Sequence, residues 1–557
     1  MTRLKLLFSA LLITTATCAS AQEGIKYTSP VDFRITMAGN VGEIRANHFH
    51  TGIDIKATNG VGSPILAVAD GYISRIAISP SGYGKALYMT HADGTVSVYA
   101  HLDGFVPQIA QWVKKQQYAK KSFRVDLYPP QDMFVFKSGE RIASLGNSGS
   151  SGGPHLHFEI RDARSGSPIN LISKGIYSVP DRVPPELYKI YYMEADTILG
   201  MPQFRIAQTL TVSSEGGVAM LSDSVIKVSR DGYLAYEVID YKDGRSNTMG
   251  VYSIEQKVGG KTNFCFTLDR ISFATTRYIN TFTEYIINKR ARQNVLRAYV
   301  SPNNALSVYK GITNRGIISR AALSAQIPVE TTITDDAGNQ TVVKFYLAAN
   351  DSLSGYSVAP ESPRAVSWSR DYAYNDSTLS VSIPQKSLYE SAVLSIAGKD
   401  STNTVTVGNP DIPLQKAITI KIIENVPEKL RNKALLATVD EKGKLSSAGG
   451  KWEAGGVKAE VRNFGRFRVA YDTVPPVIAP MPLNGSKLSF KITDDLSGIQ
   501  SYTVTVDGAW ELADYDAKND IITTTITPSA TPAKHSVQVT VSDAKANVRK
   551  ITKEYTW

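Results

Sequence analysis

Alternating hydrophobic and polar positions run through most of this chain and predict strands far more often than helices. In the N-terminal third, the alternating run 65–69 ends at the Asp70-Gly71 turn, and further runs follow at 73–78 and 87–90. Successive side chains of a strand point to opposite faces, so alternating runs joined by such turns are typical of antiparallel strands. We therefore predict a mainly β protein that begins with an antiparallel β domain.

Beyond residue 180 the chain loses histidine and gains Thr, Ser, Val and Tyr, and an internal repeat is present. The segment Asp181-Arg-Val-Pro-Pro185 recurs as Asp472-Thr-Val-Pro-Pro476. Each copy continues with an alternating strand that ends in aspartate, which is Asp240 in the first copy and Asp494 in the second. Each copy then closes with a second acidic segment, which runs from Asp336 to Asn339 in the first copy and from Asp543 to Asn547 in the second. Short alternating strands with regular turns predict immunoglobulin-like β-sandwiches.

These patterns divide the chain into five predicted parts. Arg3 and Lys5, the largely apolar run 6–13 and Ala19-Ser-Ala21 are typical of a secretory signal peptide, so we predict an exported, periplasmic or extracellular protein of the cell envelope. No later apolar run approaches the length of a membrane-spanning helix. The predicted parts are a signal peptide (1–21), an N-terminal β domain (22–180), an immunoglobulin-like β-sandwich with an insertion (181–352), a second β module (353–471) and a C-terminal immunoglobulin-like β-sandwich (472–557).

Six of the seven histidines lie in the N-terminal third, and this clustering indicates one site. The six are His48, His50, His91, His101, His155 and His157; the seventh, His535, is predicted to be a surface residue. The Gly- and Ser-rich loop 146–153 leads into an alternating run that begins at His155. On a strand, His155 and His157 point to the same face, so both imidazoles can reach one cleft.

His50 and Asp54 are separated by three residues, of which the middle one is Gly52. A straight strand would hold the two too far apart for one ion, so we predict that Gly52 bends the entry of a strand. Two imidazoles and a carboxylate are the ligand set of a catalytic zinc ion. His50, Asp54 and one histidine of the His-x-His pair satisfy it. The other member and His101 are then available as a general base and an oxyanion stabiliser.

The three segments HTGID, YAHL and GPHLHFE, in this order, resemble the lysostaphin-type (LytM-like) zinc metallopeptidases, which cut peptide bonds in bacterial peptidoglycan. The likeness covers roughly residues 30 to 175. It implies that His50, Asp54 and His157 bind one zinc ion. It also implies that His101 and His155 are the catalytic pair, without assigning which of them is the base.

The resemblance implies an exported zinc metalloendopeptidase that hydrolyses peptide cross-links of peptidoglycan, acting on stem peptides or cross-bridges. The alternative is a non-enzymatic or latent protein with the peptidase fold, which binds the cell wall or regulates other wall hydrolases. Because every expected position is filled, we favour the enzyme. The β modules are interpreted as spacers or as binding modules for the wall or a cell-envelope protein.

One departure from the compact members of this family is an insertion at residues 105–136. Pro107 suits the first turn of a helix, and apolar positions recur around it at helical spacing: Phe105, Ile109, Trp112 and Val113. We predict an amphipathic helix beside the cleft. It either packs on the domain with its lysines in solvent or contacts the substrate.

Other residues and the net charge narrow the predictions for the site and its partners. Glu159 is predicted to face the cleft and support the ligands, His48 is a weaker competing ligand, and His91 is predicted to be structural. Without the signal peptide, Cys265 is the only cysteine, which excludes an internal disulfide; we predict that it is buried. The net charge of +10 is dispersed along the chain, so it favours attraction to an acidic wall matrix, or ordinary solvated charge, over nucleic acid.

Overall fold

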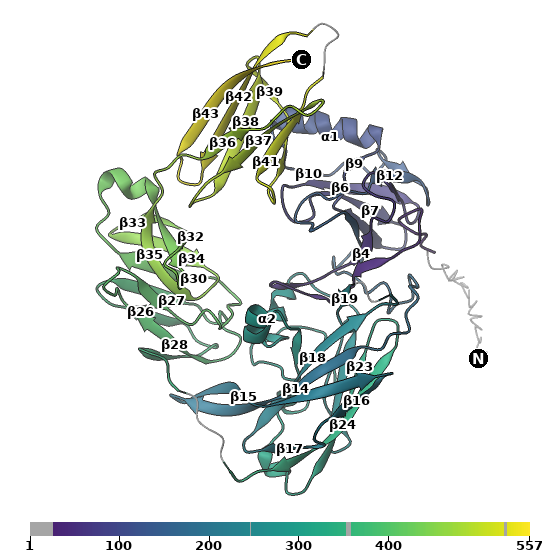
Figure 1. Cartoon of the computed structure of the whole chain (residues 1–557), viewed down its shortest axis with the longest axis vertical. Coiled ribbons are helices and arrows are strands. Elements are labelled where there is room, and N and C mark those ends of the chain that lie inside the picture. Colours follow the sequence, from purple (N-terminus) through teal and green to yellow (C-terminus); the bar gives the residue numbers. More distant parts are fainter. Residues whose placement is uncertain (1–25, 245–246, 353–357, 528–531) are drawn as a thin grey trace, which may run out of the picture.

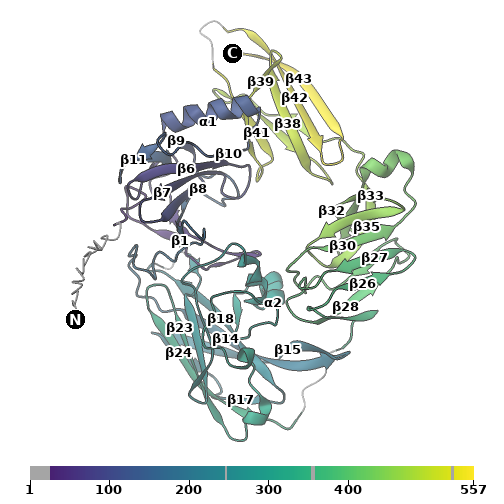
Figure 2. The ribbon, with the colours of Figure 1, turned by 180° about the vertical axis from the view of Figure 1, so that it is seen from behind.

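The computed structural model describes residues 26–244, 247–352, 358–527 and 532–557, and the predicted signal peptide lies outside them. The predicted fold class is confirmed: the protein is mainly β, and an N-terminal β domain is followed by three β modules (Figure 1). The four parts follow one another around a ring that closes where the last module meets the N-terminal domain, as the reverse view also shows (Figure 2). No helix among the described residues is long and apolar enough to cross a membrane.

The N-terminal domain is built on an eight-stranded antiparallel sheet in the order β1-β4-β13-β8-β7-β6-β10, with β11 also paired to β6. A three-stranded sheet, β5-β12-β9, and a β2-β3 hairpin complete it. The strands are β1 (Met37–Gly39), β2 (Ile44–Arg45), β3 (His48–Phe49), β4 (Ile53–Lys56), β5 (Pro64–Leu66), β6 (Gly71–Ile78), β7 (Lys85–His91), β8 (Thr95–Ala100), β9 (Gly104–Phe105), β10 (Val125–Leu127), β11 (Val135–Phe136), β12 (Arg141–Ser144) and β13 (His155–Asp162).

The predicted helix in the insertion is present as α1 (Pro107–Lys120), with Pro107 in its first turn. Ile109 and Val113 are buried in the domain core, so this face packs on the domain. No residue of α1 lines the histidine cleft. The helix therefore matches the first of the two predicted roles, and its outer face has a further contact with the last module.

The second module joins its strands, through the long β14 and β15, into an eleven-stranded sheet in which β16 and β17 run parallel to β24. The region 280–298 contains α2 and β22. The elements are β14 (Glu186–Ile198), β15 (Met201–Glu215), β16 (Val218–Leu221), β17 (Val225–Val228), β18 (Gly232–Tyr241), β19 (Thr248–Met249), β20 (Ser253–Val258), β21 (Lys261–Thr267), β22 (Val295–Arg297), β23 (Ile327–Thr334), β24 (Gln340–Ala349), α2 (Tyr285–Ala291) and the 3₁₀ helices η1 (Thr276–Thr281), η2 (Asn314–Gly316) and η3 (Arg320–Ala322).

The third module has a six-stranded and a five-stranded sheet, and the last module packs two four-stranded sheets around its own core. The third contains β25 (Pro363–Val366), β26 (Tyr372–Asn375), β27 (Leu379–Ile383), β28 (Ala392–Ala397), β29 (Val405–Val407), β30 (Ile418–Ile423), η4 (Glu428–Lys433), β31 (Ala434–Val439), β32 (Leu445–Gly449), β33 (Lys451–Glu453), β34 (Gly456–Val461) and β35 (Gly465–Tyr471). The last contains β36 (Val477–Pro480), β37 (Lys487–Thr493), β38 (Ile499–Val506), β39 (Ala509–Glu511), β40 (Ala513–Asp516), β41 (Ile521–Thr525), β42 (Lys534–Asp543) and β43 (Val548–Thr556).

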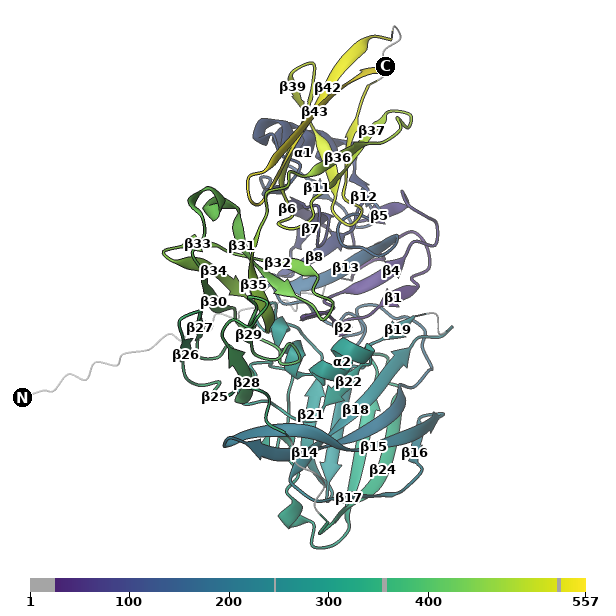
Figure 3. The same ribbon diagram turned by 60° about the vertical axis from the view of Figure 1, so that its left-hand side comes forward.

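The last module closes the ring against α1 and the Gly-rich loop of the N-terminal domain (Figure 3). The ring of Tyr118, at the end of α1, packs edge-on against Trp510 with centroids 5.2 Å apart. Lys85 Nζ lies 3.0 Å from Asp514 Oδ2, and Lys518 Nζ donates to the carbonyl of Asn147 in the Gly-rich loop. The insertion helix thus gives the last module a place to dock.

The hydrophobic core of the N-terminal domain continues without a break into the second module. Phe49 packs edge-on against Phe282 with ring centroids 5.2 Å apart, and Asn170 N donates to the Asp269 carbonyl at 3.0 Å. The sequence places a boundary near residue 180, and the sheets do divide there, but the core does not.

We therefore expect a fragment of residues 22–180 to be less stable than a fragment of residues 22–352 by several kcal/mol, because each large apolar side chain left exposed forfeits about 1.5–3 kcal/mol. Thermal unfolding of the two purified fragments measures this difference. Equal midpoints for the two would mean that the shared core adds nothing to the N-terminal domain.

Candidate active site

Two paired strands and the turn before one of them bring the predicted ligands together. β13 pairs with β4 in a register that sets His157 directly opposite Asp54, and His50 lies just before β4. Gly52 passes so close to β13 that a Cβ atom there would lie 2.4 Å from the Phe158 carbonyl oxygen. The glycine predicted to bend the strand entry is thus required for the close approach of the two segments.

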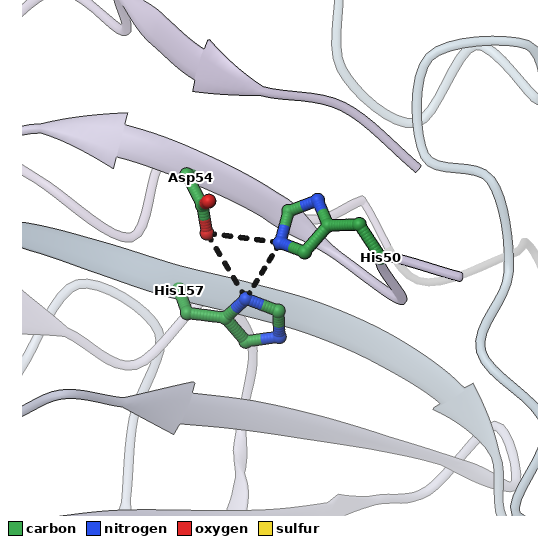
Figure 4. A group of neighbouring side chains, drawn as sticks. All are labelled: His50, Asp54 and His157. Carbon is green, nitrogen blue, oxygen red and sulfur yellow. Dashed lines mark hydrogen bonds and ion pairs between the residues drawn. The ribbon is translucent and has the colours of Figure 1, made fainter. Parts of the chain in front are cut away.

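His50, Asp54 and His157 converge at a single point (Figure 4). His50 Nε2, Asp54 Oδ1 and His157 Nδ1 form a triangle in which every side is 3.0 Å. All three residues are buried. Ligand atoms around a tetrahedral zinc ion lie about 3.3 Å apart, close to the spacing observed here.

The hydrogen bonds on the far side of each ring show which nitrogen faces the triangle without a proton. His50 Nδ1 donates to the Asn40 carbonyl at 2.7 Å, and His157 Nε2 donates to Glu159 Oε1 at 2.7 Å. In neutral rings, His50 Nε2 and His157 Nδ1 then present lone pairs towards the carboxylate. Three lone pairs facing one another repel unless a cation lies between them, so this donor set fits a metal ion such as zinc.

Glu159 is fully buried and supports His157 through a hydrogen bond, but it does not line the cleft that it was predicted to face. Its Oε1 accepts from Tyr83 at 2.6 Å and from Thr51 at 2.7 Å, and its Oε2 accepts from Arg161 Nε at 2.6 Å. Burial opposes the charged form of Glu159, but its bond to His157 and the Arg161 guanidinium hold its pKa well below the usual range. Burial likewise opposes a charged His157, but its bonds to Asp54 and Glu159 raise its pKa to about 9.

His101 and His155 lie side by side at the edge of the triangle, with ring centroids 4.7 Å apart. His155 Nε2 is 3.4 Å from Asp54 Oδ1, so its free edge faces the ligand group. Burial, followed by the charges of the neighbouring histidines, lowers the pKa of His101 to about 3. The His101 ring is therefore neutral near pH 7.

The Gly- and Ser-rich loop holds both of these rings through backbone carbonyls. His101 Nδ1 donates to the Ser148 carbonyl at 2.9 Å, and His155 Nδ1 donates to the Gly153 carbonyl at 2.8 Å. Gly149 packs so tightly on the 82–84 turn that a Cβ atom would lie 2.4 Å from the Gly82 carbonyl oxygen. His101 itself adopts a left-handed backbone with φ of 62°, which is uncommon outside glycine and frequent at functional sites. Both free Nε2 atoms are thus left available to a substrate or a water molecule.

These side chains line an open cleft of about 660 Å³ that includes all five predicted site residues. His48 also lines it, but it is exposed and lies outside the ligand triangle. Phe273 and Thr276 of the second module form part of the same wall, and Thr276 Oγ1 accepts from the Phe49 amide at 2.9 Å. The second module therefore helps to shape the cleft.

Three other sequence predictions are decided by the structure. His91 is structural: it is buried, with hydrogen bonds to the Asp70 carbonyl and Ser97 Oγ, and does not line the cleft. His535 lies in the last module, paired with Asp507 and stacked on Trp557. The prediction of a buried Cys265 is wrong: it is half-buried, because it lies on β21 with its side chain opposite the buried Phe264 and Phe266.

Several residues of the site were not identified from the sequence. Tyr83 and Arg161 bind Glu159, and Asn40 binds His50 through its carbonyl. The only signal for Tyr83 was its position between two glycines, and Arg161 continues the alternation of β13. No local pattern marks Phe273 as a residue of the cleft, because it is more than a hundred residues from the motifs.

Residues 48–120 match peptidase family M23. The N-terminal domain of this chain is an M23 domain. This confirms the family that the sequence motifs resemble. Residues 363–472, which correspond to the third module, match the Zu5-like domain.

The M23 domain has named relatives. It is 35% identical over 124 residues to the DD-carboxypeptidase/endopeptidase Mpg of Neisseria meningitidis serogroup B (strain ATCC 13091 / M2091), which covers 22% of each chain. It is 33% identical over 110 residues to the murein hydrolase activator NlpD of Escherichia coli (strain K12), which covers 20% of this chain and 22% of NlpD. The alignments thus span about a quarter of the curated relatives' length or less.

Among solved structures, the catalytic domain of the antimicrobial peptidase lysostaphin from Staphylococcus simulans is similar to this domain at 20% identity. The match covers 26% of this chain and 93% of that one, with a TM-score of 0.20. Values this low carry no conclusion about function.

Asn40 joins the M23 domain to the second module beside the ligand His50. Its side chain donates to the Gly250 carbonyl at 2.8 Å and to Asp336 Oδ2 at 3.0 Å, and its Oδ1 accepts from the Gly250 amide at 2.8 Å. We expect Asn40→Ala to lower the free energy of unfolding by about 2–4 kcal/mol, because the buried Asp336 carboxylate and two partly buried backbone groups of Gly250 lose their hydrogen bonds. Zinc should remain bound, since His50 donates to the backbone carbonyl of residue 40.

Thermal unfolding and zinc content of the Asn40→Ala variant check this prediction. An unchanged unfolding midpoint would show that the junction is not held by Asn40. Loss of zinc with unchanged stability would show that the side chain acts on His50 directly.

Proposed function

We propose that this chain is an exported zinc metalloendopeptidase that hydrolyses peptide cross-links in bacterial peptidoglycan. The observation that carries the proposal is the converging triangle of His50 Nε2, Asp54 Oδ1 and His157 Nδ1, with the imidazoles of His101 and His155 beside it. A structural zinc site needs no such free rings, whereas a catalytic site does. The names of the relatives Mpg and NlpD, which refer to peptidase activity and to murein hydrolysis, support peptidoglycan as the substrate class.

A bound zinc ion supplies Lewis-acid chemistry: it polarises a carbonyl and makes a water molecule more acidic. The residues of this chain do the rest. His101 and His155, held through their Nδ1 protons, offer two Nε2 atoms at the same edge of the cleft. One of them accepts the proton of the attacking water and returns it to the leaving amine, and the other, protonated from solvent, donates a hydrogen bond to the oxyanion.

Hydrogen bonds from neighbouring residues keep the two ligand histidines in the tautomers that a metal site requires. Asn40 and Glu159 accept the outer protons of His50 and His157, which fixes the tautomers that leave the inner nitrogens free. Arg45 Nη2 lies 3.3 Å from Asp54 Oδ2, so the oxygen that faces away from the triangle is also bound. The second module contributes Phe273 to the wall along which a peptide strand would lie.

Digestion of purified peptidoglycan tests the proposal. Zinc-loaded protein should release muropeptides whose masses show one hydrolysed peptide bond per cut, and His155→Ala should release almost none. Intact cross-links after prolonged incubation with zinc-loaded protein would contradict enzymatic activity.

The second candidate is a non-enzymatic or latent protein that binds the wall or activates other hydrolases, a role that the name of NlpD suggests. One contact favours it: Lys518 of the last module binds the Asn147 carbonyl in the loop that holds both catalytic rings. Adding the protein to a separate murein hydrolase distinguishes the two candidates. Stimulation of that enzyme, equal for wild type and His155→Ala, would favour the activator.

A further inference from the structure

Four aspartates lie together in the second module at its junction with the M23 domain: Asp181, Asp240, Asp335 and Asp336. The side chains of Asp181 and Asp240 have no exposed surface, and that of Asp336 has 1%. One oxygen each of Asp181, Asp240 and Asp335 lies within 4.8 Å of the other two. Carboxylates so close and so buried require positive charge among them.

Asp240, at the end of β18, is the aspartate of this group that lacks hydrogen-bond donors. Neither of its carboxylate oxygens accepts a hydrogen bond, although the residue is fully buried. Burial, together with the charges of the neighbouring aspartates, raises the pKa of Asp240 to about 9. A buried carboxylate that has no hydrogen-bond donor and faces two other carboxylates has the environment of a cation ligand.

Lys242 supplies only part of the charge that the group needs. Its Nζ lies 2.8 Å from Asp181 Oδ2 and also binds Asp336 Oδ1, but it is 3.9 Å from Asp240 Oδ2, beyond hydrogen-bond range. With all four carboxylates ionised, one ammonium among the described residues would leave the group a formal charge of −3. The positive charge is lacking next to Asp240, which the ammonium of Lys242 does not reach.

The last module repeats this arrangement of aspartates, and this repetition argues against a chance grouping in either module. Asp472, Asp494 and Asp543 also lie with one oxygen each within 4.8 Å. In both copies an asparagine four residues after the third aspartate donates to that carboxylate and to the backbone carbonyl of the first aspartate: Asn339 to Asp335 and Asp181, Asn547 to Asp543 and Asp472. Leu496 occupies the position that corresponds to Lys242, two residues after the strand aspartate.

We propose that Asp181, Asp240 and Asp335 bind a divalent cation of the calcium class at the junction of the second module with the M23 domain. Only oxygen atoms are offered, which favours a hard cation over zinc. Ca²⁺ accepts carboxylate oxygens in a flexible geometry, whereas Mg²⁺ demands a near-ideal octahedron and usually keeps several of its waters, so a group made of protein carboxylates fits Ca²⁺ better. This proposal does not rest on the proposed peptidase activity.

The position of the group gives the cation a role beyond local charge balance. Lys242 binds Asp336, whose Oδ2 accepts from Asn40, and the carbonyl of Asn40 accepts from the ligand His50 at 2.7 Å. A cation that holds Asp181, Asp240 and Asp335 therefore fixes the side of the junction against which His50 is oriented. Its main effect is to tie the second module to the M23 domain.

The test uses the full-length, zinc-loaded protein in buffer depleted of other divalent cations. Equilibrium dialysis with radioactive calcium counts bound Ca²⁺, and thermal unfolding follows its effect on stability. We expect binding at up to millimolar Ca²⁺, at least about tenfold tighter than Mg²⁺, and a rise in the unfolding midpoint of about 5 °C or more at a hundredfold excess over Kd. No bound Ca²⁺ and no shift under these conditions would overturn the proposal.

Paired variants assign the site. Asp240→Asn should remove one equivalent of Ca²⁺ and its thermal shift, whereas the matched variant Asp494→Asn in the last module should keep that equivalent. The opposite pattern would overturn the assignment to this group.

A second variant keeps the proposal testable if Asp240→Asn fails to fold. Lys242→Met removes the only ammonium that contacts the described aspartates of this group, so it should tighten Ca²⁺ binding by about tenfold or more. An unchanged affinity in Lys242→Met would also overturn the proposal.

Discussion

Asp54→Ala and His157→Ala should each lose most of the bound zinc and, with it, peptidoglycan cleavage. The wild-type protein should hold about one equivalent, as expected for an open three-ligand site. Removing Asp54 leaves two imidazoles without a carboxylate among the ligands, and removing His157 leaves Asp54 facing a single ring. Either change should weaken zinc binding by more than about a hundredfold, since even loss of a supporting residue costs about 10–100-fold.

Zinc content by elemental analysis after gel filtration measures this effect. His48→Ala is the matched control, because His48 lines the same cleft but is exposed and outside the triangle; it should keep its zinc. Unchanged zinc in both Asp54→Ala and His157→Ala would refute the ligand assignment. Loss of zinc in His48→Ala as well would show that the cleft, and not the triangle, determines binding.

The parts of the site that could be predicted are those carried by short-range patterns. The alternation from His155 onward specified a strand, and a strand alone sets His155 and His157 on one face. The His-x-x-x-Asp segment with its central glycine is equally local, and the structure shows why the glycine is needed there. Both features follow from the geometry of a few consecutive residues.

The parts that could not be predicted depend on backbone carbonyls and on distant segments. The carbonyls of Ser148 and Gly153 hold the rings of His101 and His155, and no side-chain pattern reveals which way a loop carbonyl points. Phe273 and Thr276 reach the cleft only because the core continues from the M23 domain into the second module. Such a continuation depends on tertiary packing and leaves no mark at residue 180.

The internal repeat shows how a local match can misalign two copies. The sequence pairs Asp336-Ala with Asp543-Ala because the letters agree. In the structure, Asp335 is the residue that accepts from Asn339, as Asp543 accepts from Asn547. The hydrogen-bonded turn of four residues therefore defines the equivalence, and Asp336 is an additional carboxylate of the first copy.

His101→Ala and His155→Ala should each retain zinc while turnover falls by about a hundredfold or more, the scale of general acid-base and oxyanion contributions. Neither ring belongs to the ligand triangle, and each is held by a loop carbonyl independent of the ligands. The loss should appear in kcat more than in KM, because the proton is moved and the oxyanion formed only during the reaction.

Because the backbone at residue 101 is left-handed, a second substitution at this position is needed as a control. With φ of 62°, alanine is strained, whereas asparagine tolerates this region, so His101→Asn separates loss of the imidazole from loss of fold. His101→Asn should match wild type in zinc content and unfolding midpoint and match His101→Ala in turnover.

If His155→Ala releases zinc while His157→Ala retains it, the roles within the His-x-His pair are reversed. If both catalytic variants retain zinc and cleave as fast as wild type, neither ring takes part in the reaction, and the base must be sought among the other residues of the cleft.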